Sequence, residues 1–214
     1  MVKYYSCEDE GLVEMAEWQP HYWISVQCPT ASDAELLDSL GVPPSFMESV
    51  ADIDERPRFD REDGWLLTII RIPHRVRGGA ADFVTIPMGV MTKDDIIITL
   101  CHYETEMVAD FIEYCNRRHV LIDNQPDFVL RLLYSSTFWF LQYLKDIKAT
   151  VAEATRDIQR SVRNQQLLNL MRQQNALVYF NTSIQGNSML TERLNNVFID
   201  DCNADLLEDV EIEM

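Results

Sequence analysis

Hydrophobic residues in the second half of the chain recur at steps of three and four, which is the spacing of one face of a helix. The clearest stripe comprises Phe140, Leu144, Ile147, Val151, Ala154 and Ile158. A looser stripe follows at Leu168, Met171, Val178 and Ile184. The two stripes predict two long helices between Asp127 and about residue 198, and the narrow first stripe is typical of a helix that packs lengthwise against another helix.

The first half instead shows short runs of strand-type residues separated by turn signals. The strongest runs are 22–28, 65–72, 83–90 and 96–101. The last two, joined by a short turn at 92–95, predict a hairpin. We also expect a short edge strand at 2–6, an acidic turn-like segment at 8–20 and a loop at 73–81. Short helices are expected at 30–41, where Thr30 is a candidate N-cap, at 45–50 and at 104–118.

The chain becomes strongly acidic from residue 200 onward. The acids there are Asp200, Asp201, Asp205, Glu208, Asp209, Glu211 and Glu213, with no Lys, Arg or His among them. On a helix, Asp201, Asp205, Glu208 and Asp209 would fall on nearby faces, where like charges repel. A basic partner, a divalent cation or simply water and salt would offset that repulsion, and Mg²⁺ or Ca²⁺ suits oxygen-only ligands. No cap, Gly or Pro ends this pattern, so we expect the helix to continue beyond the sequence.

The charge balance excludes some classes of partner. Lys and Arg number 18 and Asp and Glu 35, for a formal net charge of −17. Nucleic acids and anionic membrane surfaces would be repelled, so neither is expected as a partner. The five cysteines are scattered and form no CxxC, which favours a reducing compartment. We see no signal peptide and no run of about 18 apolar residues, and therefore expect a soluble, cytoplasmic chain.

Candidate catalytic residues are few. Cys101 and His102 could in principle supply a nucleophile and a base. Neighbours on a strand point to opposite faces, however, and a buried cysteine beside a loop histidine is the simpler interpretation. A zinc site from His74, His102 and a cysteine lacks a recognisable ligand spacing. The Gly78-Gly79 pair has no phosphate-loop pattern, and neither GxSxG nor HExxH occurs. We predict that the chain is not an enzyme.

Four motifs, taken in order, resemble the CorA-type divalent-cation transporter family. They are the turn Asp52–Arg58, the strand Trp65–Pro73, the strand Asp95–Leu100 and the acidic segment Leu207–Val210. The resemblance covers essentially the whole chain and implies the N-terminal cytosolic domain of such a transporter. The two transmembrane helices and the Gly-Met-Asn signature of full-length members are not in the sequence.

By this resemblance the fold is α+β and has three parts. Residues 1–123 would form an α/β/α sensor domain with a mixed sheet. Residues 124–199 would form antiparallel long (willow-type) helices, about 127–161 and 164–198. Residues 200–214 would be the start of a stalk helix, truncated before the transmembrane segment. The parent protein would lie in the inner membrane through its C-terminal helices alone, with this part in the cytoplasm.

The resemblance further implies a homopentamer that transports Mg²⁺, Co²⁺ or Ni²⁺ and is gated by intracellular Mg²⁺ bound at acidic sites between subunits. Asp209 matches the stalk member of the carboxylate pair that holds the regulatory ion. Asp82 is the only acid in the loop after the 65–72 strand, so it is the candidate partner. Asp205 and Glu208 are weaker candidates. Co²⁺ or Zn²⁺ could take the place of Mg²⁺ at this site.

Two alternatives stay open at this point. A soluble helical adaptor could use the acidic tail to bind a basic protein, and the cytosolic domain of a zinc-transporting relative would share the same plan. Salt separates the adaptor from the sensor. Binding to a basic protein would weaken as monovalent salt rises, whereas a cation site would respond to Mg²⁺ at fixed ionic strength.

Overall fold

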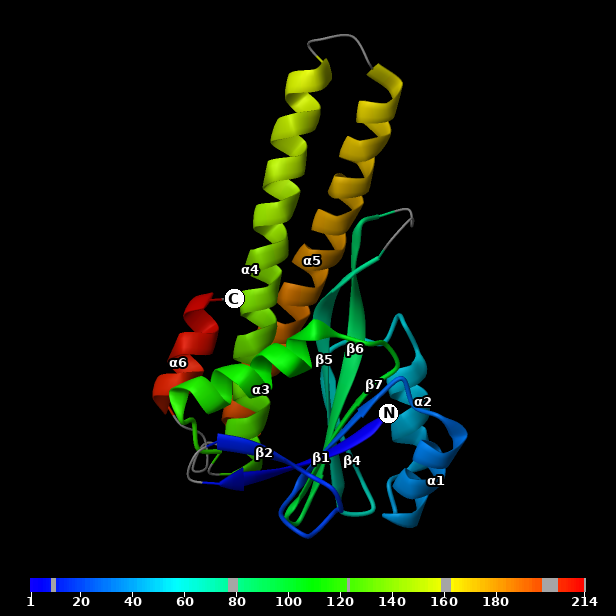
Figure 1. Cartoon of the computed structure of the whole chain (residues 1–214), viewed down its shortest axis with the longest axis vertical. Coiled ribbons are helices and arrows are strands. Elements are labelled where there is room, and N and C mark those ends of the chain that lie inside the picture. Colours follow the sequence, from blue (N-terminus) through cyan, green and yellow to red (C-terminus); the bar gives the residue numbers. More distant parts are fainter. Residues whose placement is uncertain (9–10, 77–80, 123, 159–162, 198–203, 214) are drawn as a thin grey trace.

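The computed structural model describes residues 1–8, 11–76, 81–122, 124–158, 163–197 and 204–213. Strands and helices follow one another along these residues (Figure 1) as β1 (Val2–Glu8), β2 (Gly11–Met15), β3 (Trp23–Gln27), α1 (Ala31–Ser39), α2 (Pro44–Ala51), β4 (Arg58–Glu62), β5 (Trp65–Arg75), β6 (Phe83–Lys93), β7 (Ile96–Cys101), α3 (Glu106–Arg118), α4 (Gln125–Ile158), α5 (Arg163–Val197) and α6 (Ala204–Glu213). This order confirms the predicted α+β class.

The strands form one seven-stranded mixed sheet in the order β2-β1-β3-β7-β6-β5-β4. Neighbouring strands are antiparallel except β3 and β7, which are parallel. The predicted hairpin joins β6 to β7 through Asp94 and Asp95, and Asp94 adopts a φ of 47°. Helices α1 and α2 cover one face of the sheet, and α3, α4 and α5 cover the other (Figure 1).

The N-terminal strands differ from the prediction. β1 is not an edge strand, because it pairs with both β2 and β3, and β2 lies within the segment that was expected to be turn-like. β2 fully buries one apolar side chain, Leu12, while Val13 is 40% exposed, so its sequence carries a weak strand signal. Asn116 of α3 holds it in place. Its side-chain amide accepts a hydrogen bond from the Leu12 N–H (2.7 Å) and donates one to the Leu12 carbonyl (3.1 Å).

The predicted loop at 73–81 is shorter in the structure, because β5 continues to Arg75. Pro73 lies inside this strand, paired with Thr85 of β6. The pairing of β4 with β5 stops at Arg58, which lies opposite Ile69, so beyond Ile69 this edge of β5 has no neighbouring strand among the described residues. A proline, which has no N–H, is tolerated at such an unpaired edge. Gly78 and Gly79 lie outside the described residues.

The two long helices are confirmed, but only α4 buries its predicted stripe. Phe140, Ile147 and Ala154 of α4 are buried. On α5 the looser stripe is mostly exposed: Leu168, Met171 and Val178 are 53%, 53% and 59% accessible. The face that α5 buries is instead mixed, with Gln173, Ala176, Phe180, Ser183, Asn187, Leu190, Thr191 and Leu194. Because this buried face is partly polar, the spacing of hydrophobic residues alone does not identify it.

A buried polar cluster joins α5 to the sheet. The Asn187 amide accepts from the Arg71 backbone N–H (2.9 Å) and donates to the Arg71 carbonyl (2.8 Å). Asn187 therefore fills the ladder position that β4 leaves open next to β5. Ser183 pairs with the Thr85 hydroxyl at 2.8 Å, and Arg71 donates to the same hydroxyl at 2.9 Å.

The Arg71 guanidinium also explains the 52–58 turn. It is 9% exposed and donates to the carbonyls of Ile53 and Glu55, so a buried positive charge organises this turn. Burial lowers the pKa of Arg71, while the nearby acids Asp54, Asp52 and Glu55 act in the opposite direction. Arg71 thus connects the turn that resembles the family motif to strands β5 and β6.

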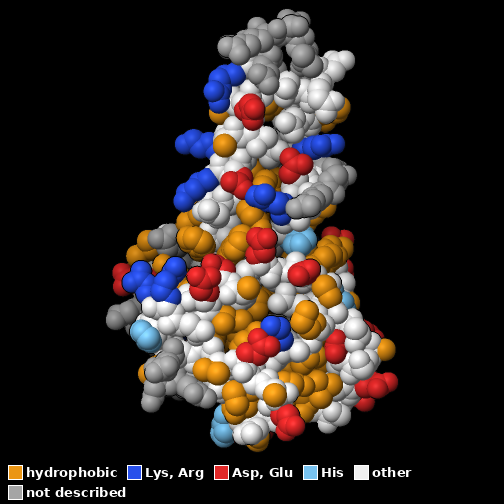
Figure 2. Space-filling model, viewed as in Figure 1, with side chains coloured by type: hydrophobic (Ala, Val, Ile, Leu, Met, Phe, Trp, Pro, Cys, Tyr) orange, Lys and Arg blue, Asp and Glu red, His pale blue; other side chains and the backbone are white. Residues whose placement is uncertain are grey.

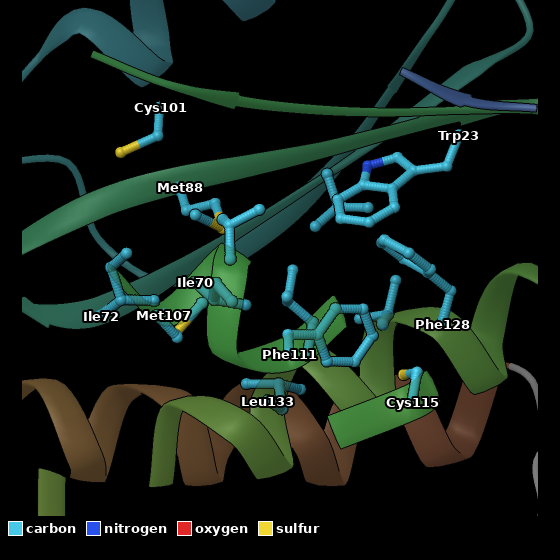
Figure 3. Close-up of a cluster of buried hydrophobic side chains, with 14 of the residues drawn as sticks. Trp23, Ile70, Ile72, Met88, Cys101, Met107, Phe111, Cys115, Phe128 and Leu133 are labelled. Atoms are coloured by element: carbon cyan, nitrogen blue, oxygen red, sulfur yellow. The ribbon is translucent and has the colours of Figure 1, made fainter. Parts of the chain in front are cut away.

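The core between the sheet and the long helices is rich in aromatic contacts (Figure 3). The Trp23 indole N–H donates to the Thr99 hydroxyl (2.9 Å), and its ring meets Phe111 and Phe128 edge-on at 5.9 and 5.1 Å. Val210 of α6 belongs to the same core. One core therefore contains residues from both sides of position 123, and the proposed domain division there stays a prediction.

Candidate functional site

Asp82 lies immediately before β6, at the end of the β5–β6 hairpin where the chain passes from β5 to β6. Its backbone carbonyl accepts a hydrogen bond from the Val76 N–H (2.9 Å). This bond extends the contact between the two arms of the hairpin one residue beyond the last strand pair, Arg75 and Phe83. The half-buried carboxylate of Asp82 accepts a hydrogen bond from Nε2 of Gln173 on α5. Asp82 is therefore held between the sheet and the long helices.

Gln173, which bonds the candidate Asp82, is a residue that the sequence analysis did not single out. Its side chain is 1% exposed, and its Oε1 atom has no hydrogen-bond partner among the described residues. A buried amide oxygen without a partner is costly, since its desolvation is not repaid. No sequence signal marks the position, because a glutamine in a long helix is ordinarily a surface residue.

A cavity of about 580 Å³ opens beside Asp82, lined by Arg75, Val76, Asp82, Phe83, Asp146, Ala149 and Thr150. Two carboxylates, Asp82 and Asp146, thus line the same space. Arg75 forms an ion pair with Asp146, and its guanidinium lies over the rings of Phe83 and Tyr143 at 5.1 and 5.3 Å. Asp146 is therefore neutralised within the chain. Asp82 has no ion pair with any residue that the structure describes.

The acidic helix α6 lies against α4 and buries Leu207 and Val210 (Figure 1). Glu208 and Asp209 point away from this contact and are exposed, and Asp209 has no hydrogen bond or ion pair within the described part of the chain. The side chain of Asp205 lies outside what the structure describes, as do Asp200 and Asp201.

Within one chain, the structure does not pair the two leading candidates. Asp82 contacts Gln173 at the hairpin, whereas Asp209 lies on a helix packed against α4 and α5. No group of three or more His, Cys, Asp or Glu side chains with metal-binding geometry occurs among the described residues. The predicted pairing was between two subunits, so it stays a prediction.

The cysteine and histidine candidates form no catalytic arrangement. The Cys101 thiol is 1% exposed, and burial raises its pKa to about 12, so it stays protonated near neutral pH. His102 is exposed, as expected for a loop histidine next to a buried strand cysteine. His74 packs against the Tyr103 ring at 5.6 Å, and burial lowers its pKa.

Residues 18–214 match the model of the family described as CorA-like Mg²⁺ transporter protein. The chain belongs to this family. Membership confirms the resemblance to this family that the sequence analysis found. It also agrees with the prediction that the chain is not an enzyme. No described helix of this CorA-family chain is both long enough and apolar enough to cross a membrane.

Solved structures share the fold at low sequence identity. The complete CorA magnesium transporter from Methanocaldococcus jannaschii matches with a TM-score of 0.82 and 14% identity, covering 99% of this chain and 68% of that one. The soluble domain of CorA from the same organism matches with a TM-score of 0.81 and 15% identity, covering 99% of this chain and 86% of that one. The ZntB cytoplasmic domain from Vibrio parahaemolyticus matches with a TM-score of 0.72 and 12% identity, again covering 99% of this chain and 86% of that one. No curated protein matches the chain by sequence.

Proposed function

We propose that this chain is the cytoplasmic regulatory domain of a homopentameric Mg²⁺ transport channel that also accepts Co²⁺ or Ni²⁺. In this proposal intracellular Mg²⁺ gates the channel by binding between subunits. Asp82 of one subunit and Asp209 of its neighbour hold the ion, with Glu208 and Asp205 close to the second. Transport itself would take place in an inner-membrane segment C-terminal to α6.

The observation that carries the proposal is the family match over residues 18–214. The donor chemistry supports it, since Asp82 and Asp209 offer carboxylate oxygens and Gln173 offers a buried amide oxygen with no described partner. Mg²⁺ prefers oxygen ligands and needs only one or two carboxylates, because it usually keeps several waters. The available donors therefore fit Mg²⁺ better than a metal that requires sulfur or imidazole ligands.

Charge repulsion between subunits would supply the gating energy. Each chain carries a formal charge of −17, so carboxylates that face one another across an interface favour separation. A shared cation offsets that repulsion and favours the closed ring, and its loss lets the ring loosen. The shift in equilibrium depends only on the difference in affinity between the two states, and several weak sites multiply their effects.

Thermal denaturation of the 214-residue chain with increasing MgCl₂ at fixed ionic strength tests the proposal. We expect Mg²⁺ to raise the Tm of the wild-type chain, because a ligand that binds only the folded state stabilises it. Asp82→Asn and Asp209→Asn should each remove most of this rise. Since the proposed site lies between subunits, the rise should also grow with protein concentration.

Asp38→Asn is the matched control, because Asp38 is an exposed acid on α1, across the sheet from Asp82. This variant should respond to Mg²⁺ as the wild-type chain does. A wild-type response in Asp209→Asn would show that α6 does not carry the site. A wild-type response in Asp82→Asn alone would show that another acid of residues 1–123, and not Asp82, binds the ion together with Asp209.

A further inference from the structure

Three arginines line one small cavity on this acidic molecule. The cavity of about 290 Å³ lies between α3 and α4 and is lined by Asp110, Tyr114, Arg117, Arg118, Arg131, Tyr134, Ser135 and Phe138. In Figure 2 a cluster of basic side chains lies on the left of the molecule, at the level of α3. Since acids outnumber bases 35 to 18 in the chain, this local excess of positive charge is unusual for it.

Arg131 is oriented by a buried acid. Its Nε donates to Oδ2 of Asp127 at 2.7 Å, and the two side chains are 19% and 3% exposed. That bond uses Nε and leaves the two terminal amino groups for other acceptors. A planar guanidinium presents those groups as a fork that matches a phosphate or a carboxylate. Arg131 is thus fixed in a conformation that suits an anion in the cavity.

Arg117 and Arg118 approach from the last turn of α3. Both are exposed, and neither forms a hydrogen bond or an ion pair with any residue that the structure describes. Cations at a helix C-terminus are favoured by the helix dipole, and this accounts for basic residues at that position. It does not account for their convergence with Arg131 of a different helix on one cavity.

The remaining lining residues narrow the class of anion. Three arginines and Asp110 give the lining a formal charge of +2, part of which the neighbouring Asp127 offsets. A phosphate monoester carries about −1.5 to −2 near neutral pH and three acceptor oxygens. Tyr114, Tyr134 and Phe138 add aromatic surface, and the Phe138 ring is 51% exposed. Such a ring at the edge of a cavity can stack against a flat base, and arginine can add a cation–π contact.

We propose that this cavity binds a small phosphate monoester that carries an aromatic base, a ligand of the mononucleotide class. The phosphate lies on Arg117, Arg118 and Arg131, and the base packs against Phe138 and the two tyrosines. Oδ2 of Asp110 accepts a hydrogen bond from the Trp139 indole N–H (3.2 Å). Asp110 would have to give up this bond to compete with the phosphate for the arginines. This site is separate from the proposed cation site at Asp82 and Asp209.

Isothermal titration of the 214-residue chain with AMP tests this proposal, with adenosine and inorganic phosphate as matched probes. AMP should bind more tightly than either probe, because each lacks one half of the ligand. Arg118→Gln and Arg117→Gln should each weaken AMP binding about tenfold, the loss expected for one charge-assisted hydrogen bond. Arg61→Gln, which removes an exposed arginine from β4, should leave AMP binding unchanged.

Arg131 is tested by Arg131→Lys rather than by truncation. Lysine keeps a positive charge beside the buried Asp127 carboxylate, whereas truncation would leave that charge uncompensated and could unfold the chain. Lysine lacks the fork, so Arg131→Lys should weaken AMP binding while its circular dichroism spectrum matches the wild type.

Four results would overturn the proposal. AMP could fail to bind at millimolar concentration, or Arg61→Gln could weaken binding as much as Arg118→Gln does. Inorganic phosphate could bind as tightly as AMP, which would show that the aromatic side chains contact no base. If the Arg117 and Arg118 variants change the sedimentation coefficient but not AMP binding, these arginines belong to a contact between subunits instead.

Discussion

At the residue scale, single polar side chains decide how α5 meets the sheet. Asn187 occupies the ladder position next to Arg71, and Gln173 holds the Asp82 carboxylate about four helical turns away on the same helix. Both side chains are 1% exposed. The scarcity of acids in its loop makes Asp82 a candidate from the sequence alone. The sequence does not identify Asn187 or Gln173 in the same way, because nothing along the chain links either residue to its partner on the sheet.

Asn187→Leu should therefore be strongly destabilising. Leucine keeps a similar volume but leaves the Arg71 N–H and carbonyl buried without partners, at about 1–3 kcal/mol for each group. We expect the free energy of unfolding to fall by about 2–4 kcal/mol in urea denaturation. Asn181→Leu is the control, since Asn181 is exposed on the same helix. If the two variants lose equally little stability, water or a neighbouring group replaces the Asn187 contacts.

At the element scale, the packing of α2 on β6 depends on a glycine in the strand. A Cβ atom at Gly89 would lie 2.4 Å from Val50 Cγ2 and 3.3 Å from Leu67 Cδ1. From the sequence alone, this glycine only weakens a strand. The long β-branched runs of β5, β6 and β7 and the Thr30 capping box of α1 were nevertheless sufficient to predict these elements. The contact between α2 and β6 needed the structure.

Gly89→Ala should destabilise the chain by about 1–3 kcal/mol, because the added methyl group overpacks the contact with Val50. Val50→Ala removes the atoms that the new methyl group would meet. The double variant should therefore lose less stability than the sum of the two single variants, by at least about 0.5 kcal/mol in a double-mutant cycle. Urea denaturation of the four proteins gives this coupling energy.

Val26→Ala provides the matched cycle for this test. Val26 is buried in the same cluster as Val50 but lies on β3, which β7 separates from β6. Its combination with Gly89→Ala should be additive. Equal coupling in both cycles would mean that Gly89→Ala disturbs the whole face of the sheet and not the α2 contact.

At the scale of the whole molecule, an acidic α/β block carries two long helices that extend well beyond the sheet (Figure 1). The order of the four motifs was enough to predict the family, since each motif has a fixed structural place: the 52–58 turn is held by Arg71, and Val210 is part of the core. The proposed pairing of Asp82 with Asp209 joins two copies of the chain, so the order of motifs along one chain carries no information about it.

Sedimentation velocity addresses that pairing directly. If Asp82 and Asp209 of neighbouring chains share an ion, MgCl₂ should shift the 214-residue chain towards a larger assembly, and removal of the metal with EDTA should reverse the shift. NaCl at the same ionic strength should have a smaller effect, because it screens the −17 charge without bridging carboxylates. Asp209→Asn should respond to MgCl₂ only as far as to NaCl. Equal shifts with both salts in the wild-type chain would mean that screening alone drives assembly and that the two acids hold no ion.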